Sequence, residues 1–165
     1  MKRPLASLLA LLWILAGCTG PNSRVATRLN DLAELSGEIG ASSNPLSWKV
    51  ITSGVNSKSS TMYTLYGNDI AVLYARTNAG RNYPDGALLA LVTWRQQEDA
   101  RWFGARIPAQ PASVELLNVS VRQDGHRSSA YRRYEGSPLR EVASTESQTE
   151  ARVASLLSLR AAVMP

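Results

Sequence analysis

The chain has 165 residues, of which 44% are hydrophobic, a formal net charge of +5 and a single cysteine. This length is sufficient for one domain with its own hydrophobic core. One cysteine excludes an internal disulfide and a cluster of thiolate metal ligands. The sequence also contains no P-loop, no G-x-G-x-x-G and no G-x-S-x-G motif, so the common nucleotide-binding and serine-hydrolase signatures are absent from it.

The first 18 residues predict a secretion signal that ends at a lipid-attachment site. Lys2 and Arg3 precede an apolar run that extends to Ala16 and is too short for the roughly 20 residues of a spanning helix. Leu15-Ala16-Gly17-Cys18 resembles the lipobox of bacterial lipoproteins. That resemblance implies removal of residues 1–17, acylation of Cys18 by palmitate-type chains and, because Thr19 replaces an aspartate, the periplasmic face of the outer membrane.

The mature chain is expected to be weakly basic. Loss of Lys2 and Arg3 lowers the formal charge by two, from +5 to +3, and arginine supplies most of what remains. A nucleic-acid surface would need a basic stripe interleaved with exposed aromatic residues. The nearest candidate contains Arg122, Arg127, Tyr131, Arg132, Arg133 and Tyr134. In a periplasmic protein we interpret it as a solvated strand face or a weak attraction to lipid headgroups, not as a nucleic-acid site.

Residues 18–44 are expected to form a lipidated tether with one short helix. Within Thr27–Ile39, three apolar residues (Leu29, Leu32 and Ala33) recur at helical spacing, and Gly37 and Gly40 would break the helix. A Ser/Asn/Pro linker follows, so we place the folded domain at residues 45–165.

The first part of this domain predicts two strands and a helix. Trp48–Thr52 and Thr61–Tyr66 are expected to be strands, with Gly54–Ser60 as a polar loop between them. Asn68 is a typical N-cap, and apolar residues at helical spacing follow it until Gly80.

The segment Tyr83–Pro108 predicts the central hairpin. Ala87–Trp94 is uncharged and indicates a buried strand, Gln96–Asp99 a polar tip, and the residues from Trp102 to Ile107 the returning strand that Pro108 would end. Two of the three tryptophans of the mature chain, Trp94 and Trp102, lie here, so we expect the core to form around them.

The last third predicts a second hairpin and a helix. Ser113–Val121 is expected to be an interior strand, with Pro111-Ala112 as the connector before it, and Asp124-Gly125 a turn that leads to the strand Ser128–Tyr134. Thr145 and Gln148 form a capping-box pattern at the start of an amphipathic helix. The predicted fold class is therefore α+β: a mostly antiparallel sheet with a helix after the second strand and a C-terminal helix.

Three segments together resemble the cytochrome P460 family: SWKVIT, TMYTLYGNDIA and YPDGALLALVTW. Tyr66, Asn68 and Ala71 match a Y-x-N-x-x-A-like motif, and Pro84 and Gly86 match a P-x-G-like turn. The resemblance covers about residues 45–135. It implies an antiparallel sheet with helices around a pocket, usually in a homodimer.

The resemblance does not extend to haem attachment. Haem-bearing members carry C-x-x-C-H near the C-terminus and many cross-link the haem to a lysine, but here the one cysteine is Cys18 and a helix is expected over the C-terminal residues. Neither Lys49 nor Lys58 can be assigned the cross-linking role. His126, the only histidine, is a weak candidate ligand for non-covalent haem, since a solvent-exposed turn residue is the expected alternative.

Other chemistry is sparse in the sequence. Glu98 and Asp99 are adjacent carboxylates at a hairpin tip, where solvated charges are expected rather than an acid–base pair. No catalytic residue and no zinc cluster can be identified. Five residues could line an apolar ligand pocket with one cationic group, with core packing as the alternative: Tyr66, Tyr83, Trp94, Trp102 and Arg106.

Two functional hypotheses follow. The first is a lipid-anchored binding or structural module that uses a P460-like scaffold without covalent haem or another cofactor, and that need not be an enzyme. The second is a redox protein that holds haem non-covalently and acts on small nitrogen species, as the resemblance to haem-bearing members implies. A homodimer is compatible with both.

Overall fold

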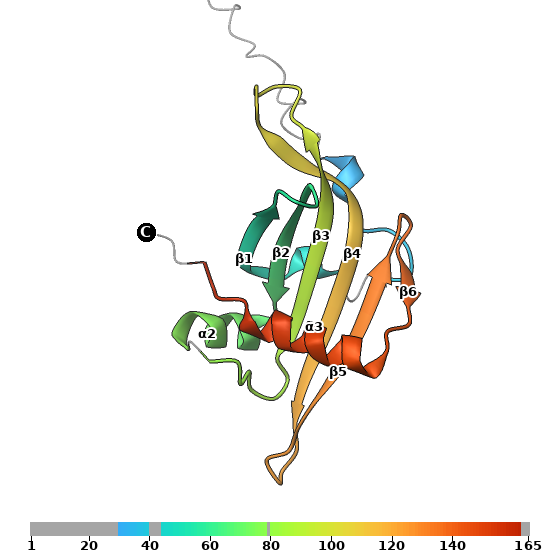
Figure 1. Cartoon of the computed structure of the whole chain (residues 1–165). Coiled ribbons are helices and arrows are strands. Elements are labelled where there is room, and N and C mark those ends of the chain that lie inside the picture. Colours follow the sequence, from blue (N-terminus) through green and yellow to red (C-terminus); the bar gives the residue numbers. More distant parts are fainter. Residues whose placement is uncertain (1–29, 40–43, 79, 163–165) are drawn as a thin grey trace, which may run out of the picture. The chain divides into compact units, whose positions relative to one another are not determined.

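A single antiparallel sheet of six strands organises the protein, and the strands lie in the sheet in their order along the chain (Figure 1). The computed structural model describes residues 30–39, 44–78 and 80–162. Each strand pairs antiparallel with the next one. The strands are β1 (Lys49–Asn56), β2 (Thr61–Gly67), β3 (Leu88–Glu98), β4 (Arg106–Val121), β5 (Arg127–Glu135) and β6 (Arg140–Val142).

Two α-helices begin at the caps that the sequence predicts. The Asn68 side chain accepts a hydrogen bond from the Ala71 amide and starts α2 (Asp69–Thr77), directly after β2. A complete capping box between Thr145 and Gln148 starts α3 (Glu146–Ser158). These caps satisfy amide groups that a helix end leaves without a partner. The α+β prediction, with its antiparallel sheet and two helices, is confirmed.

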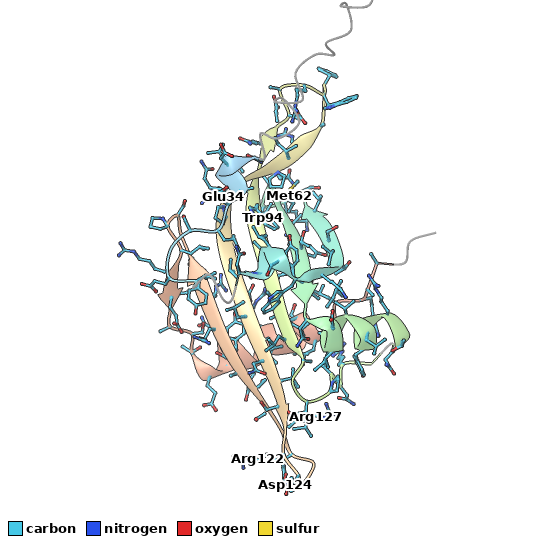
Figure 2. The ribbon with its side chains drawn as sticks, turned by 180° about the vertical axis from the view of Figure 1, so that it is seen from behind. Glu34, Met62, Trp94, Arg122, Asp124 and Arg127 are labelled. Carbon is cyan, nitrogen blue, oxygen red and sulfur yellow. The ribbon has the colours of Figure 1, made fainter. Side chains whose placement is uncertain are left out.

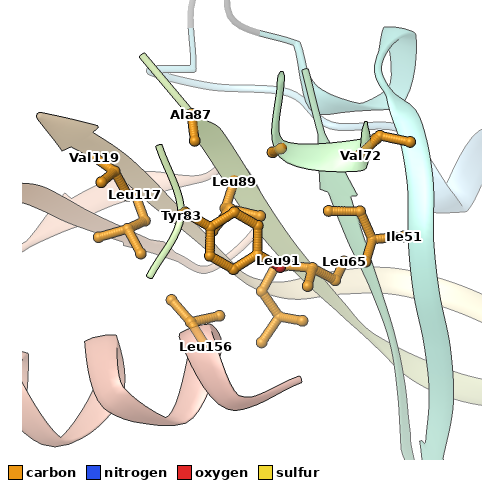
Figure 3. Packing of buried hydrophobic residues seen from close by; sticks show 11 residues of the cluster. Ile51, Leu65, Val72, Tyr83, Ala87, Leu89, Leu91, Leu117, Val119 and Leu156 are labelled. Carbon is orange, nitrogen blue, oxygen red and sulfur yellow. The ribbon is translucent and has the colours of Figure 1, made fainter. Parts of the chain in front are cut away.

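Both helices cover the same face of the sheet and enclose the main hydrophobic core. Val72 from α2 and Leu156 from α3 pack with Tyr83 and with strand residues such as Leu65 and Leu89 (Figure 3). Tyr83, which the sequence places at the start of the central hairpin, is only 2% exposed. We call this cluster the helix-side core.

A second core covers the other face of the sheet, because successive side chains of a strand point to opposite sides. Val92, Trp94, Val114, Tyr134 and Leu139 form this core, and Ala33, Leu35 and Ile39 pack against it. The Trp94 Nε1 group donates to the Ala33 carbonyl at 3.0 Å. The compact unit that contains the sheet begins at Leu32.

The segment before the sheet differs from the predicted helix in its described part. Residues 1–29, including the N-terminal part of that expected helix and the whole signal segment, lie outside the described residues. Within residues 30–39, only Asp31–Ala33 is helical, as one 3-10 turn, and Gly37 then forms a parallel bridge with Leu139. A Cβ atom on Gly37 would lie 2.2 Å from the Leu139 carbonyl oxygen, so this close approach requires glycine.

The central hairpin is longer than predicted, and its prolines do not end it. The prediction of a connector at Pro111-Ala112 is wrong, because β4 continues from Arg106 through Pro108 and Pro111 to Val121. Both prolines lie where the register with β3 shifts, next to Trp94. A bulge tolerates a proline because the regular ladder of hydrogen bonds is already interrupted there.

Three further details differ from the sequence-based expectations. Trp102 is 71% exposed and lies outside both cores, so only Trp94 of the two hairpin tryptophans contributes to a core. Gly54 and Val55 belong to β1 rather than to a loop. The short strand β6 was not predicted.

Candidate functional site

The five residues predicted to line one aromatic pocket lie in different parts of the domain. Tyr83 is in the helix-side core, with its ring centroid 4.8 Å from that of Tyr74. Tyr66 and Trp94 share the opposite face. Trp102 is exposed on the β3–β4 hairpin, and Arg106 at the base of that hairpin pairs with Glu98 at 3.4 Å. The structure therefore brings Tyr66 and Trp94 to one core but does not bring all five to one cavity.

The tyrosines of these two cores stay uncharged at ordinary pH. Burial, the largest cause, raises the pKa of Tyr66, and burial together with the neighbouring Tyr74 raises the pKa of Tyr83. Both side chains therefore keep a protonated, neutral hydroxyl. Their rings fill the cores, which indicates a packing role rather than proton transfer.

The described residues do not fit an axial haem site at His126. This histidine is exposed in the turn between β4 and β5, where its amide donates to the Asp124 carboxylate at 2.9 Å. A haem ligand needs a pocket that encloses the macrocycle, and none of the described cavities includes His126. Lys49 is exposed and pairs with Asp69 at 2.7 Å, and Lys58 is exposed in the β1–β2 turn.

Metal and acid–base sites receive no support from the other polar groups. Glu98 pairs with Arg106, and Asp99 lies 3.7 Å from the Arg101 Nε atom, so the two carboxylates belong to surface ion pairs. Within residues 30–39, 44–78 and 80–162, no three His, Cys, Asp or Glu side chains converge on a common point. In the same ranges, no helix is long and apolar enough to cross a bilayer.

The strongest electrostatic feature is a carboxylate buried beneath α3. Glu115 lies in the middle of β4 and is 2% exposed, the one buried charged side chain among the described residues. Arg152 of α3 binds it with both arms of its guanidinium, Nε to Oε2 at 2.9 Å and Nη2 to Oε1 at 2.6 Å. The Tyr131 hydroxyl of β5 donates to Oε2 at 2.6 Å. We call these three residues the Glu115 cluster.

The cluster is built for a charged carboxylate. Two donors from a planar guanidinium match the two carboxylate oxygens, and charge-assisted bonds of this kind are roughly twice as strong as neutral ones. The hydrogen bonds to Glu115 raise the pKa of Arg152, which therefore remains a cation. Burial, and then the bond to Glu115, raise the pKa of Tyr131 to about 12, so its hydroxyl stays protonated and continues to donate.

Next to this cluster, an open cavity of about 450 Å³ separates β5 from the start of α3. Its wall includes two guanidinium groups, Arg133 and Arg152. Arg133 lies directly opposite Glu115 in the β4–β5 register. Its Nη2 atom is 2.5 Å from the Glu135 carboxylate, but its buried Nε atom has no hydrogen-bond partner. The lining residues are Arg133, Glu135, Val142, Ala143, Ser144, Gln148, Ala151 and Arg152. We call this hollow the β5–α3 cavity.

The sequence carried two signals for this site that the prediction did not use. Glu115 is a single charge inside an otherwise uncharged strand, Ser113–Val121. Arg152 is four residues before Leu156 and therefore lies on the apolar face of α3. Charges on the buried faces of two elements suggest an ion pair between them. No such signal in the sequence indicates that the Nε atom of Arg133 lacks a partner, since this depends on how β5 and α3 pack.

The family follows from the comparison with family models. The model described as Cytochrome P460 matches residues 46–151, more than half of the chain. The protein belongs to the cytochrome P460 family. The expected resemblance is thereby confirmed, and the match includes the sheet, α2 and nearly all of the β5–α3 cavity of this P460 domain. The comparison with curated proteins gives no match.

The Glu115–Arg152 pair predicts a large effect when one partner is removed. Arg152→Met keeps the apolar stem but leaves the Glu115 carboxylate buried without its cation. We expect a loss of about 3 kcal/mol in the free energy of unfolding, the low end of the range for a broken buried pair, because Arg152 is partly exposed. Urea denaturation of the full chain measures this change in the free energy of unfolding.

Arg160→Met, just after α3, is the matched control and should change the stability by less than about 0.5 kcal/mol. The double variant Glu115→Gln/Arg152→Met should recover part of the loss, since no buried charge then remains. Equal losses for Arg152→Met and Arg160→Met would mean that the pair does not hold α3 on the sheet.

Proposed function

We propose that this protein is a lipid-anchored periplasmic binding module, in which a P460 domain without covalent haem binds a small carboxylate in the β5–α3 cavity. The observation that carries this proposal is the buried Arg133 Nε atom, which has no partner and belongs to a side chain that lines an open cavity. A buried donor without a partner costs free energy unless a ligand or water accepts its hydrogen bond.

The charges of the cavity favour an anion. Its wall contains Arg133, Arg152 and one acid, Glu135. Arg152 already binds Glu115 through both Nε and Nη2. Arg133 pairs with Glu135 through Nη2 only and keeps its Nε donor without a partner, so Arg133 is the cation that a ligand would engage. A guanidinium presents its donors in a fixed fork that matches a carboxylate or a phosphate. The volume of about 450 Å³ lies within the range of small-molecule sites.

The ligand proposal predicts that Arg133 governs the affinity for small anions. Succinate and inorganic phosphate serve as probes, titrated by calorimetry into the full detergent-solubilised chain at constant ionic strength. We expect succinate to bind and Arg133→Gln to weaken it by about tenfold or more, equivalent to about 1.4 kcal/mol.

Arg132→Gln is the matched control, because Arg132 is the adjacent residue of β5 and is exposed on the other face of the sheet. It should leave succinate binding unchanged. If neither probe binds, or if both variants weaken binding equally, the site is not a carboxylate site.

The anchoring part of the proposal rests on the lipobox-like ending at Cys18. A diacylglycerol on this residue would bury two long chains at about 0.8 kcal/mol per CH₂, enough for stable attachment. Cys18→Ala should therefore move the protein from the membrane to the soluble periplasmic fraction on cell fractionation. Thr19→Asp should keep it membrane-bound but shift it from the outer to the inner membrane. A Cys18→Ala protein that still partitions with detergent-extracted membranes would contradict the anchor.

Membership of the P460 family supports the second candidate, a redox protein that binds haem non-covalently. An absorption spectrum of protein purified from its native membrane separates the two candidates. The binding-module proposal predicts a colourless protein that ignores added hemin. A stoichiometric Soret band that is lost in His126→Ala would instead establish the haem protein.

A further inference from the structure

The β3–β4 hairpin ends in two large aromatic side chains that face solvent. Trp102 is 71% exposed and Phe103 is fully exposed. They lie in the loop between β3 and β4, residues 99–105, which we call the aromatic tip. The hairpin extends as a narrow two-stranded ribbon beyond the rest of the sheet (Figure 1).

The shape of the aromatic tip does not depend on these two side chains. The Asp99 amide donates to the Ala105 carbonyl at 3.0 Å, and the Ala105 amide donates to the Trp102 carbonyl at 3.0 Å. The Asp99 carboxylate accepts from the Arg101 amide at 2.8 Å. The backbone closes the loop by itself, and Trp102 and Phe103 belong to neither core, so their exposure needs another explanation.

The start of the compact unit, at Ala33 and Glu34, lies toward the same end of the sheet as the aromatic tip. Ala33 accepts the hydrogen bond from Trp94, and β3 continues from Trp94 toward the tip for four residues, about 13 Å. Glu34 and Trp94 lie at that end in Figure 2, and Asp124 in the β4–β5 turn lies at the opposite end. From Leu32 to Cys18 is a segment of 14 residues, which spans at most about 50 Å.

The charges around the tip suit a phospholipid surface. Residues 95–106 contain three arginines and two acids. Arg101 and Arg106 pair with Asp99 and Glu98, which leaves the exposed Arg95 as the excess cation. Arginines that flank exposed aromatic residues are attracted to anionic headgroups. Tryptophan is enriched at the membrane–water interface, where its ring meets apolar chains and its N–H stays hydrated.

We propose that the aromatic tip inserts Trp102 and Phe103 into the interfacial region of the phospholipid membrane that carries the anchor. The inference rests on the proposed anchoring at Cys18, because the anchor keeps the tip close to the lipid. The domain then contacts the membrane twice, through the lipid chains on Cys18 and through the aromatic tip. Two contacts restrict the orientation of the domain on the membrane, whereas the lipid chains alone would let it rotate.

Quenching by brominated phosphatidylcholine tests this insertion. The lipidated full chain is reconstituted in vesicles of phosphatidylethanolamine and phosphatidylglycerol with a brominated lipid, and tryptophan emission is compared with that in unbrominated vesicles. Trp102 is one of three tryptophans in the mature chain, so we expect partial quenching in the wild type and quenching at least about threefold weaker in Trp102→Phe. Trp48→Phe is the matched control and should show at least the wild-type fractional quenching, since Trp48 lies before β1, outside the hairpin.

Further outcomes separate this inference from the anchor itself. Wild-type protein that stays on the vesicles while the Trp102 emission is unquenched leaves the anchor intact and overturns the tip insertion. A Cys18→Ala protein whose Trp102 is still quenched supports the insertion and contradicts the anchor. A dimer in detergent that Trp102→Ser/Phe103→Ser converts to monomer would assign the tip to a second copy of the chain and overturn the insertion.

Discussion

One buried ion pair, between Glu115 of β4 and Arg152 of α3, constrains the rest of the structure. A carboxylate in the middle of the longest strand, 2% exposed, is compatible with folding only when a cation and further donors reach it. Arg152 and Tyr131 supply those groups from two other elements. The C-terminal helix α3 therefore stabilises the sheet, because without it β4 would carry an unpaired buried charge.

This pairing also distinguishes the two guanidinium groups of the β5–α3 cavity. Arg152 binds Glu115 through Nε and Nη2. Arg133, on the same face of the neighbouring strand β5, pairs with Glu135 through Nη2 and keeps a buried Nε donor without a partner. Arg152 therefore has a structural role, and Arg133 is the group to which we assign the proposed ligand. The cavity and the aromatic tip are separate features of the same sheet, since one borders α3 and the other ends the β3–β4 ribbon.

Local signals in the sequence predicted the elements well where a cap or turn has a mechanism of its own. Asn68, Thr145 and Asp124-Gly125 act through hydrogen bonds within a few residues, so their effect does not depend on the rest of the fold. Pro108 and Pro111 led to the wrong prediction that the strand ends there, because bulges in the β3–β4 pairing accommodate both prolines. A bulge is a property of two strands together, and neither strand alone reveals it.

The candidate site could be predicted only in part. The charges at Glu115 and Arg152 stand out within apolar patterns, and a pairing could have been inferred from them. The five-residue aromatic pocket failed to assemble because Tyr83 and Trp94 lie on opposite faces of the sheet. The face of each aromatic residue follows from strand register, and the cavity follows from how α3 packs beside β5. Both are set by tertiary contacts.

The contact between the first described segment and β6 has a consequence for the order of folding. The Glu141 amide donates to the Glu38 carboxylate, and these residues are 103 positions apart. Synthesis from the N-terminus delivers residues 36–38 long before their partners at 139–141. Val92, Trp94 and Val114 of the second core stay uncovered for that interval, and nascent chains in such a state attract chaperones. Synthesis of almost the whole polypeptide must therefore precede closure of this face.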